Sequence, residues 1–398
     1  MDRRSAQTFH PRILLVGTEA LHLRLPLMQQ LAEAGFEVSA AGALPQPEFD
    51  DTPFDYHRYS ISRSFSPFGF RRSVRSLRDV IRRDAPDLVH AVNTIPCLVA
   101  PHAVRGTGVP CVRTVTGLGS VFSADTWLYR LMQAAFRFQH RRIRNVCEST
   151  IFQNPDDLDF FVENGLSPAD KVGLIYGSGI DVDGLARQRS SPKVLDDLRT
   201  ELGLHGKTVI TMVSRLMKVK GVDEFAATAA AVRRHRPDTA FLLVGPAVTN
   251  GPMAVSASFL DGNDDVQWLG LRHDIPDLLA VSDVFALPTY LREGIPRVLF
   301  EAGALKLPLI TTDTPGCRET VLDGENGFLI PPRSSAALTE AVLKLLESPE
   351  RRQEMGQRSY ELMKNRFELT IVSAAYVELY RKTFGTDETL DEPIRSAA

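Results

Sequence analysis

Short apolar runs rich in β-branched residues alternate with amphipathic helical patterns along most of this chain, in two successive series. The first series begins with "RILLVG" (12–17), continues with a helical stretch that ends at Gly35, and proceeds to "FEVSAAG" (36–42). Strands that alternate with helices form parallel sheets with helices on both faces. The sequence therefore predicts an α/β protein with two doubly wound, Rossmann-like domains. The other expected strands are 87–92, 110–116 and 150–154 in the first series, and 208–214, 239–245, 266–270, 284–288, 307–312 and 327–331 in the second.

The length of the chain also favours two domains, because 398 residues exceed what one hydrophobic core ordinarily holds. In doubly wound sheets, ligands bind outside the carboxyl ends of the strands, so we expect a site in a cleft between two facing sheets. The expected divisions are a first domain (1–185), a linker (186–207), a second domain (208–366), and a terminal segment (367–398) whose helix crosses back to the first domain.

Cysteine usage and hydropathy restrict the cellular setting. Cys97, Cys111, Cys147 and Cys317 form no C-x-x-C pair, which argues against a disulfide framework or a zinc site and fits a reducing cytosol. The N-terminal stretch lacks the apolar region of a signal peptide. No stretch approaches the roughly 18 apolar residues of a membrane-spanning helix. We therefore expect a cytoplasmic protein.

The net charge of −3 conceals an asymmetry between the two halves. Residues 1–150 contain 19 Lys and Arg against 13 Asp and Glu, whereas the remainder contains 27 against 36. Basic residues concentrate in "RRSVRSLRDVIRR" (71–83) and "FRFQHRRIRN" (136–145), and 126–145 also carries Trp127 and other large apolar residues. These segments have two interpretations: solvated faces of helices that cover a sheet, or interfacial helices that contact an anionic membrane surface or a lipid diphosphate.

Two glutamates flank a turn ahead of an apolar helical run in "LREGIPRVLFEAGA". Pro296 suits the first position of a helix, and Gly294 lets the backbone approach a ligand closely. The N–H groups of the first helical turn then bind anions such as a nucleotide phosphate. Glu301 lies about a turn and a half into the helix, where a carboxylate can accept two ribose hydroxyls, and Glu293 can reach further along the same ligand. Alone, this pattern is also that of a capped helix with two incidental acids.

Two cations follow an earlier strand in "VSRLMKVKG". Arg215 and Lys220 can together neutralise a diphosphate, although on their own they could equally be surface cations of a loop.

These motifs, with "SDVFALPTYLREGIPRVLFEA", "PGCRET" and "DGENGFLIPP", resemble glycosyltransferase family 4 in order and spacing over roughly residues 205–335. The family's members are retaining enzymes with the GT-B fold. In the first half, "TVTGLGSVF", "IFQNPDDLDFF" and "LIYGSGIDVD" resemble bacterial transferases that extend sugars on polyprenyl diphosphates, for surface polysaccharides or protein glycans.

The resemblance implies a role for each residue of the candidate site. Arg215 and Lys220 bind the donor diphosphate and stabilise the leaving group, Glu293 holds a hydroxyl of the donor sugar, and Glu301 holds the ribose. The remaining donor-binding residues are Gly17, Gly270, Leu271, Arg272, Gly294, Ile295, Pro296 and Arg297. The acceptor side includes Thr116, Gly117 and Asn154. Many members have His-Gly where this chain has Thr116-Gly117, so the identity of the sugar stays open.

The implied reaction is hexosyl or N-acetylhexosaminyl transfer from a nucleotide-sugar, with UDP as the expected nucleotide, to a lipid-linked glycan at the inner face of the cytoplasmic membrane. No cofactor, metal or nucleic acid is expected. "DVD" (181–183) matches the D-x-D of metal-using transferases, but we interpret it as structural. His90, His140 and His273 lack the spacing of metal ligands.

Two alternatives remain: a nucleotide-sugar 2-epimerase of the same architecture, and a non-catalytic nucleotide-sugar-binding protein. A dinucleotide oxidoreductase is disfavoured, because the first strand is not followed by G-x-G-x-x-G.

Overall fold

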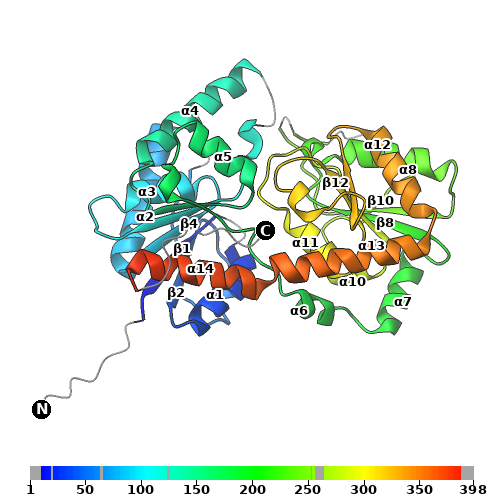
Figure 1. Ribbon diagram of the computed structural model, residues 1–398, viewed down its shortest axis with the longest axis horizontal. Helices are drawn as coiled ribbons and strands as arrows, with labels where there is room; N and C mark the ends of the chain where they lie inside the picture. Colours follow the sequence, from blue (N-terminus) through cyan, green and yellow to red (C-terminus); the bar gives the residue numbers. More distant parts are fainter. Residues whose placement is uncertain are drawn as a thin grey trace, which may run out of the picture. The chain divides into compact units, whose positions relative to one another are not determined.

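The computed structural model describes residues 10–18, 21–62, 66–122, 126–251, 253–255 and 264–386. Within these ranges the chain forms two compact units, each built on one parallel sheet (Figure 1). The first unit comprises 1–118, 126–178 and 370–398, and the second comprises 119–125 and 179–369.

The first unit has a seven-stranded sheet in the order β3-β2-β1-β4-β5-β6-β7. Strand β1 is buried on both faces by covering helices, so its sequence is apolar almost throughout. The register pairs Ile13 of β1 with Val38 on one side and with Leu88 on the other. The strands are β1 (Arg12–Val16), β2 (Glu37–Gly42), β3 (Tyr56–Arg58), β4 (Leu88–Val92), β5 (Cys111–Val115), β6 (Ser149–Phe152) and β7 (Val172–Leu174).

Helices cover this sheet, and their ends follow local sequence signals. Gly35 has a φ of +95° just beyond α1, a conformation that suits glycine. The helices are α1 (Leu25–Glu33), α2 (Pro67–Asp84), α3 (Pro96–Ala103), α4 (Trp127–Ile143) and α5 (Pro155–Glu163).

Helix α14 (Leu369–Phe384) brings the chain back to the first unit. The buried imidazole of His90 in β4 contacts the Tyr380 hydroxyl at 2.5 Å and the Thr114 hydroxyl at 2.8 Å, and Thr114 also contacts the Tyr376 hydroxyl at 3.2 Å. Burial lowers the pKa of His90 to about 3, so the ring is neutral and serves packing. The expected terminal helix is thus confirmed.

The second unit has a six-stranded sheet in the order β10-β9-β8-β11-β12-β13. Its strands are β8 (Thr208–Val213), β9 (Thr239–Val244), β10 (Gln267–Trp268), β11 (Val284–Leu287), β12 (Leu309–Thr312) and β13 (Gly327–Ile330). Its helical segments include α6 (Val182–Arg187), α7 (Pro192–Glu201), the 3₁₀ turn η5 (Lys218–Lys220), α8 (Val222–Arg233), α10 (Ile275–Ala280), α11 (Arg297–Ala304), α12 (Ser335–Leu346), α13 (Pro349–Leu362) and the π-helical turn η7 (Met363–Phe367).

The expected strands are all present, with ends that differ by one or two residues, but the expected linker 186–207 folds differently. Most of it forms α7, and it is grouped with the second unit. Leu198, Leu202 and Leu204 pack into a buried cluster with Val209 of β8. The polar residues that suggested a linker occupy the outer side of this helix.

Candidate active site

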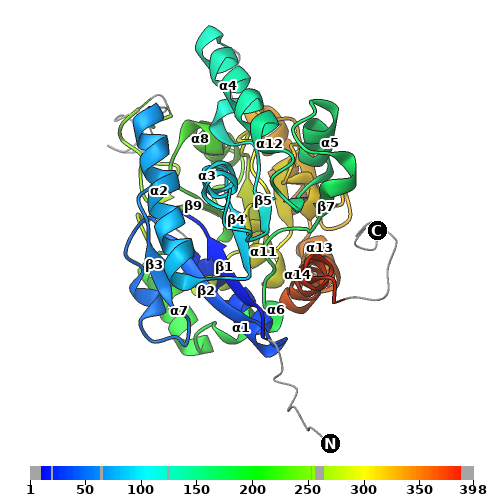
Figure 2. The same ribbon diagram turned by 90° about the vertical axis from the view of Figure 1, so that its left-hand side faces the viewer.

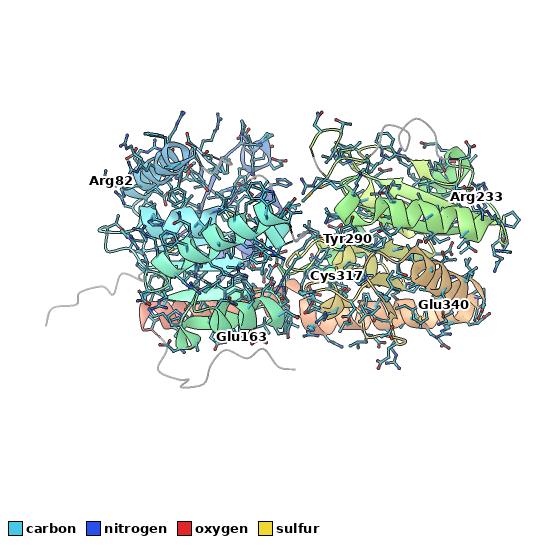
Figure 3. The ribbon with its side chains drawn as sticks, turned by 90° about the horizontal axis from the view of Figure 1, so that it is seen from above. Arg82, Glu163, Arg233, Tyr290, Cys317 and Glu340 are labelled. Carbon is cyan, nitrogen blue, oxygen red and sulfur yellow. The ribbon has the colours of Figure 1, made fainter. Side chains whose placement is uncertain are left out.

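The candidate site lies in the second unit, in the loops that follow β8, β11 and β12. In a parallel sheet these loops gather at the carboxyl edge. Figure 3 shows Tyr290 and Cys317, which follow β11 and β12, at one end of this unit, and Arg233 and Glu340 at the other end.

Lys220 and Glu293 meet at the centre of these loops. The Lys220 ammonium group donates a hydrogen bond to Oε1 of Glu293, and the two side chains are only 11% and 24% exposed. The loop that carries Glu293 is fixed to η5, because the Thr289 hydroxyl and the Tyr290 N–H both donate to the carbonyl of Val219, at 3.1 and 2.9 Å. The ion pair is therefore held in place by backbone contacts on both sides.

Two glycines allow the loops to approach this closely. Gly221 has a φ of +81°, and a Cβ there would lie 2.2 Å from the carbonyl oxygen of Pro288. Gly316 has a φ of +89°, and a Cβ there would lie 1.5 Å from the carbonyl oxygen of Gly294. The Gly316 N–H donates to the Glu319 carboxylate at 2.7 Å, which fixes the loop after β12. Larger residues at either glycine would push the Glu293 loop away from its neighbours.

Helix α11 begins at Arg297, and Pro296 is its N-cap residue with a ψ of 118°. The sequence suggested that Pro296 occupies the first position of the helix. Its extended ψ lies outside the helical range, so Pro296 precedes the helix instead. The N–H groups of the first turn have no carbonyl four residues earlier, and the helix dipole places partial positive charge at this end. The turn at Gly294 and Ile295 thus leads into a helix end suited to an anion.

Glu301 lies on α11, one turn beyond Arg297, and its carboxylate accepts a hydrogen bond from the Arg297 Nε at 2.9 Å. Burial raises the pKa of Glu301, and the neighbouring Arg297 charge opposes part of this effect. The carboxylate and guanidinium are both partly exposed, so a ligand can replace this contact.

Arg215 follows β8, and its side chain is exposed. Within the described part of the chain, the Arg215 guanidinium forms no hydrogen bond or ion pair. Its loop is fixed by the Leu216 N–H, which donates to the carbonyl of Pro246 at 2.9 Å. Arg215 is therefore an exposed cation on an anchored backbone, beside the same sheet edge as Lys220.

The loop after β10 joins this sheet edge through Gly270, whose carbonyl accepts from the Gly245 N–H at 2.7 Å. Leu271 is 63% exposed. The Arg272 guanidinium is bound by Asp274, at 2.8 Å through Nε and 2.5 Å through a terminal nitrogen, so its orientation is fixed along its own loop. Of these two residues, only Leu271 presents an open side chain to a ligand.

The remaining candidates belong to the first unit. Gly17 follows β1, and its carbonyl accepts from the Tyr59 hydroxyl at 3.1 Å. The Thr116 hydroxyl accepts from the Asn93 amide at 3.2 Å, and Gly117 has a φ of +100°. Asn154 is fully buried and caps α5: it accepts from the Asp157 N–H at 2.8 Å and donates to the Asp157 carboxylate at 3.0 Å. This geometry makes Asn154 a capping residue instead of an open acceptor contact.

The two aspartates of "DVD" have structural partners. Asp181 caps α6 by accepting from the Gly184 N–H at 2.6 Å. Asp183 accepts from the Tyr360 hydroxyl at 2.8 Å and from the Lys364 ammonium at 2.9 Å. Both carboxylates thus hold α6 in place.

Sequence reasoning overlooked three residues around the ion pair: Thr289, Gly316 and Cys317. Cys317 is fully buried, and burial together with the Glu293 charge raises its pKa to about 11. The thiol is therefore protonated at neutral pH and packs beneath the site. Thr289 could have been found only from the fold, since its partner Val219 is 70 residues away.

Comparisons with known proteins agree with this arrangement. Residues 24–176 match the family described as Glycosyl transferase 4-like domain, and residues 196–362 match Glycosyl transferases group 1. The Campylobacter jejuni N,N'-diacetylbacillosaminyl-diphospho-undecaprenol alpha-1,3-N-acetylgalactosaminyltransferase is 26% identical over 92% of this chain and 96% of its own length. The Escherichia coli UDP-Gal:alpha-D-GlcNAc-diphosphoundecaprenol alpha-1,3-galactosyltransferase is 25% identical over 75% of this chain and 76% of its own.

Among solved structures, Anabaena HepE in complex with UDP-glucose superposes with a TM-score of 0.76 at 20% identity, covering 94% of this chain and 100% of HepE. At this identity the match concerns the fold. Together, the two sheets, the site and these matches define an enzyme of the GT-B glycosyltransferase class. The chain belongs to the glycosyltransferases in which a glycosyl transferase 4-like domain is followed by a glycosyl transferases group 1 domain.

Proposed function

We propose that this enzyme moves a sugar from a UDP-sugar to a hydroxyl of a glycan linked to a lipid diphosphate, with retention of the anomeric configuration. The observation that carries the proposal is the largely enclosed Lys220–Glu293 ion pair, whose side chains are 11% and 24% exposed, beside the start of α11. The names of the Campylobacter and Escherichia relatives, which both act on undecaprenyl-diphosphate-linked sugars, support the acceptor class.

In this mechanism, cations and N–H groups neutralise the donor diphosphate. Lys220 and Arg215 contact the phosphates, and the first turn of α11 adds its dipole. Because Lys220 is already desolvated by its surroundings, its charge acts in a site of low dielectric, where it is worth more than in water. Lys220 and Arg215 together make a metal ion unnecessary for leaving-group stabilisation.

The Lys220–Glu293 pair has a second consequence for the donor. When the diphosphate attracts Lys220, the Glu293 carboxylate gains capacity to accept a hydrogen bond from a hydroxyl of the donor sugar. Gly294 and Ile295 bring backbone N–H groups to the sugar or phosphate, and Glu301 accepts the ribose hydroxyls. The ribose then competes with Arg297 for the Glu301 carboxylate.

Retention requires the acceptor to attack the anomeric carbon on the same face from which the leaving group departs. The bond between the anomeric carbon and the phosphate oxygen breaks, and the acceptor oxygen forms the new bond on the same face. The acceptor proton passes to a phosphate oxygen of the departing UDP. Because the donor itself takes this proton, no protein base is needed, and the protein contributes orientation and charge stabilisation.

Product analysis separates this proposal from its alternatives. We expect purified enzyme, a UDP-sugar and a short-chain lipid diphosphate sugar to yield a disaccharide whose NMR coupling constants show the donor's anomeric configuration, with no effect of EDTA. Without an acceptor, slow release of UDP is expected. Release of a 2-epimer would indicate the epimerase, inversion would exclude the retaining mechanism, and tight donor binding without any turnover would indicate a non-catalytic protein.

A further inference from the structure

Asn93 follows β4 in a backbone conformation that few residues other than glycine adopt. Its φ is +73°, in the left-handed region, which asparagine enters at some cost in strain. Its carbonyl accepts from the Cys97 N–H at 3.0 Å, so the residue forms the turn from β4 into α3. The side chain does not cap that helix, because its amide instead donates to the Thr116 hydroxyl at 3.2 Å. Residues held in such conformations cluster at ligand sites.

Asn93 and Thr116 lie side by side at the carboxyl edge of the first sheet. Strands β4 and β5 are parallel neighbours, with Val92 opposite Thr114, and each of the two polar residues comes directly after the last residue of its strand. Figure 2 shows β4, β5 and α3 beside one another in the first unit. Ligands of doubly wound sheets bind outside this edge, and both side chains are partly exposed there.

Buried contacts beneath this pair fix both strand ends. The Cys97 thiol of α3 donates to the carbonyl of Ala91 in β4 at 3.5 Å and to that of Thr114 in β5 at 3.2 Å. The Thr114 hydroxyl is also joined to His90 of β4 and to Tyr376 of α14. Asn93 and Thr116 therefore lie on a rigid base, as a site that holds a ligand in one orientation requires.

The contact between Asn93 and Thr116 uses only part of their hydrogen-bonding capacity. A side-chain amide has a carbonyl oxygen besides its NH₂ group, and a hydroxyl can donate one bond as well as accept. Among the described residues, neither Oδ1 of Asn93 nor the hydroxyl hydrogen of Thr116 has a partner. The pair thus presents one open acceptor next to one open donor.

Two neighbouring hydroxyls of a sugar ring match this arrangement. One hydroxyl donates to Oδ1 of Asn93 while its neighbour accepts from the Thr116 hydroxyl, because a hydroxyl can do either. A single acetamido group does not match, since the N–H and C=O of a trans amide point in opposite directions. In the proposed function, residues of the second unit bind the donor's diphosphate, ribose and sugar, so the sugar left for the first unit is that of the acceptor.

We propose that Asn93 and Thr116 bind two neighbouring ring hydroxyls of the acceptor sugar, and that Asn93 thereby selects acceptors in which both hydroxyls are free. Asn93 supplies the open amide that the sequence suggested at Asn154, which is fully buried and caps α5. The sequence does not reveal Asn93, because its backbone conformation and its contact with a residue 23 positions away arise only in the fold. The inference rests on the proposed function, which supplies the glycan acceptor.

Binding of the full-length enzyme to three short-chain lipid diphosphate sugars, measured by calorimetry without nucleotide, tests the role of neighbouring hydroxyls. The first probe carries glucose, whose ring hydroxyls at positions 2, 3 and 4 form two neighbouring pairs. The 3-deoxyglucose probe has no such pair, whereas the 6-deoxyglucose probe keeps both. Wild type should bind the 3-deoxy probe about fivefold more weakly than the glucose probe, as the loss of one neutral hydrogen bond predicts, and the 6-deoxy probe within about twofold.

Asn93→Gly assigns the preference to this residue. Glycine adopts a φ of +73° without strain, so the variant removes the amide and leaves the turn. It should bind the glucose and 3-deoxy probes equally. The matched control is Ala85→Gly, because Ala85 is an exposed residue of the same unit with a φ of +47°, and this variant should keep the fivefold preference. Thr116→Val, which retains the shape of the side chain but not the hydroxyl, should also lose the preference.

Four results would each overturn the inference. They are equal binding of the glucose and 3-deoxy probes by wild type, a preference that persists in Asn93→Gly, a preference that is lost in Ala85→Gly as well, and no binding of the glucose probe. Because the calorimetry needs neither donor nor turnover, probe binding can fail while sugar transfer stands, and transfer can fail while probe binding stands.

Discussion

Gly316 fixes the distance between the loop after β12 and the loop that carries Glu293. A Cβ at this position would lie 1.5 Å from the Gly294 carbonyl oxygen and 2.8 Å from the Glu293 carbonyl oxygen. Both obstacles are backbone atoms, which no rotamer change can move aside. Gly316→Ala is therefore expected to displace the backbone at the start of the donor-binding turn.

The size of the effect follows from that geometry. Real Cβ atoms essentially never approach heavy atoms within 3.0 Å, so the two loops must separate by about 1.5 Å. Displacements of about 1 Å in a positioned site can reduce turnover about a hundredfold. Alanine at a φ of +89° adds strain of about 1–2 kcal/mol. We expect kcat/KM for the UDP-sugar to fall about a hundredfold and the melting temperature to fall by several degrees.

Gly324 supplies the matched control, because its φ is +81° and nothing lies within 4 Å of an added Cβ. Gly324→Ala carries the same backbone strain, so its melting temperature should fall by a similar amount, but its kcat/KM should stay close to that of wild type. Steady-state kinetics and calorimetry on both variants decide the matter. Wild-type turnover in Gly316→Ala, or equal losses of turnover in the two variants, would refute the reasoning that the close approach of these loops sets the donor site.

Three further predictions concern charged groups. Arg215→Ala and Lys220→Ala should each lower kcat about a hundredfold, as the loss of one preorganised charge-stabilising donor does. If rapid-quench measurements give either variant a turnover near that of wild type, its contact with the diphosphate is contradicted. Because burial raises the pKa of Glu301, folding favours its protonated form, and stability is lost as the pH rises through that raised pKa. Glu301→Gln should therefore raise the melting temperature at pH 7, by an amount that shrinks towards pH 4. Calorimetry should also show weaker binding of the UDP-sugar to this variant. A gain in melting temperature that does not vary with pH would contradict the burial argument. The Lys364 ammonium lowers the pKa of Asp183, so this contribution to stability is present above the ordinary carboxyl pKa and is lost as the pH falls through the lowered one. Asp183→Asn should thus destabilise the enzyme to urea at pH 7, by an amount that shrinks as the pH falls below the ordinary carboxyl pKa. A loss that does not vary with pH would show that the ion pair is not responsible.

Local patterning predicted most of the fold. The central strands are buried on both faces, so each appears as an apolar run, and their ends differed by only one or two residues. Strands β3 (Tyr56–Arg58) and β7 (Val172–Leu174) were not predicted, because three-residue edge strands carry too little pattern. The sequence predicts a linker where helix α7 forms, because the outward residues of this helix outnumber the leucines that anchor it.

Only part of the candidate site could be predicted from the sequence, since its contacts join distant segments. The turn before α11 could be located from Gly294 and Pro296, but the cap position of Pro296 depends on its ψ. The contact between Lys220 and Glu293 spans 73 residues and follows from the sheet order. The need for glycine at 316 likewise arises from backbone on another loop, which no local pattern reveals.

The central claim is that the second unit binds the donor diphosphate between the start of α11, Arg215 and Lys220. A crystal structure of the enzyme with UDP tests it most directly. We expect the two phosphates to lie within hydrogen-bonding distance of Lys220 and the first-turn N–H groups of α11, with the ribose hydroxyls on Glu301. Phosphates bound away from that helix end, or a Lys220 side chain turned from them, would contradict it.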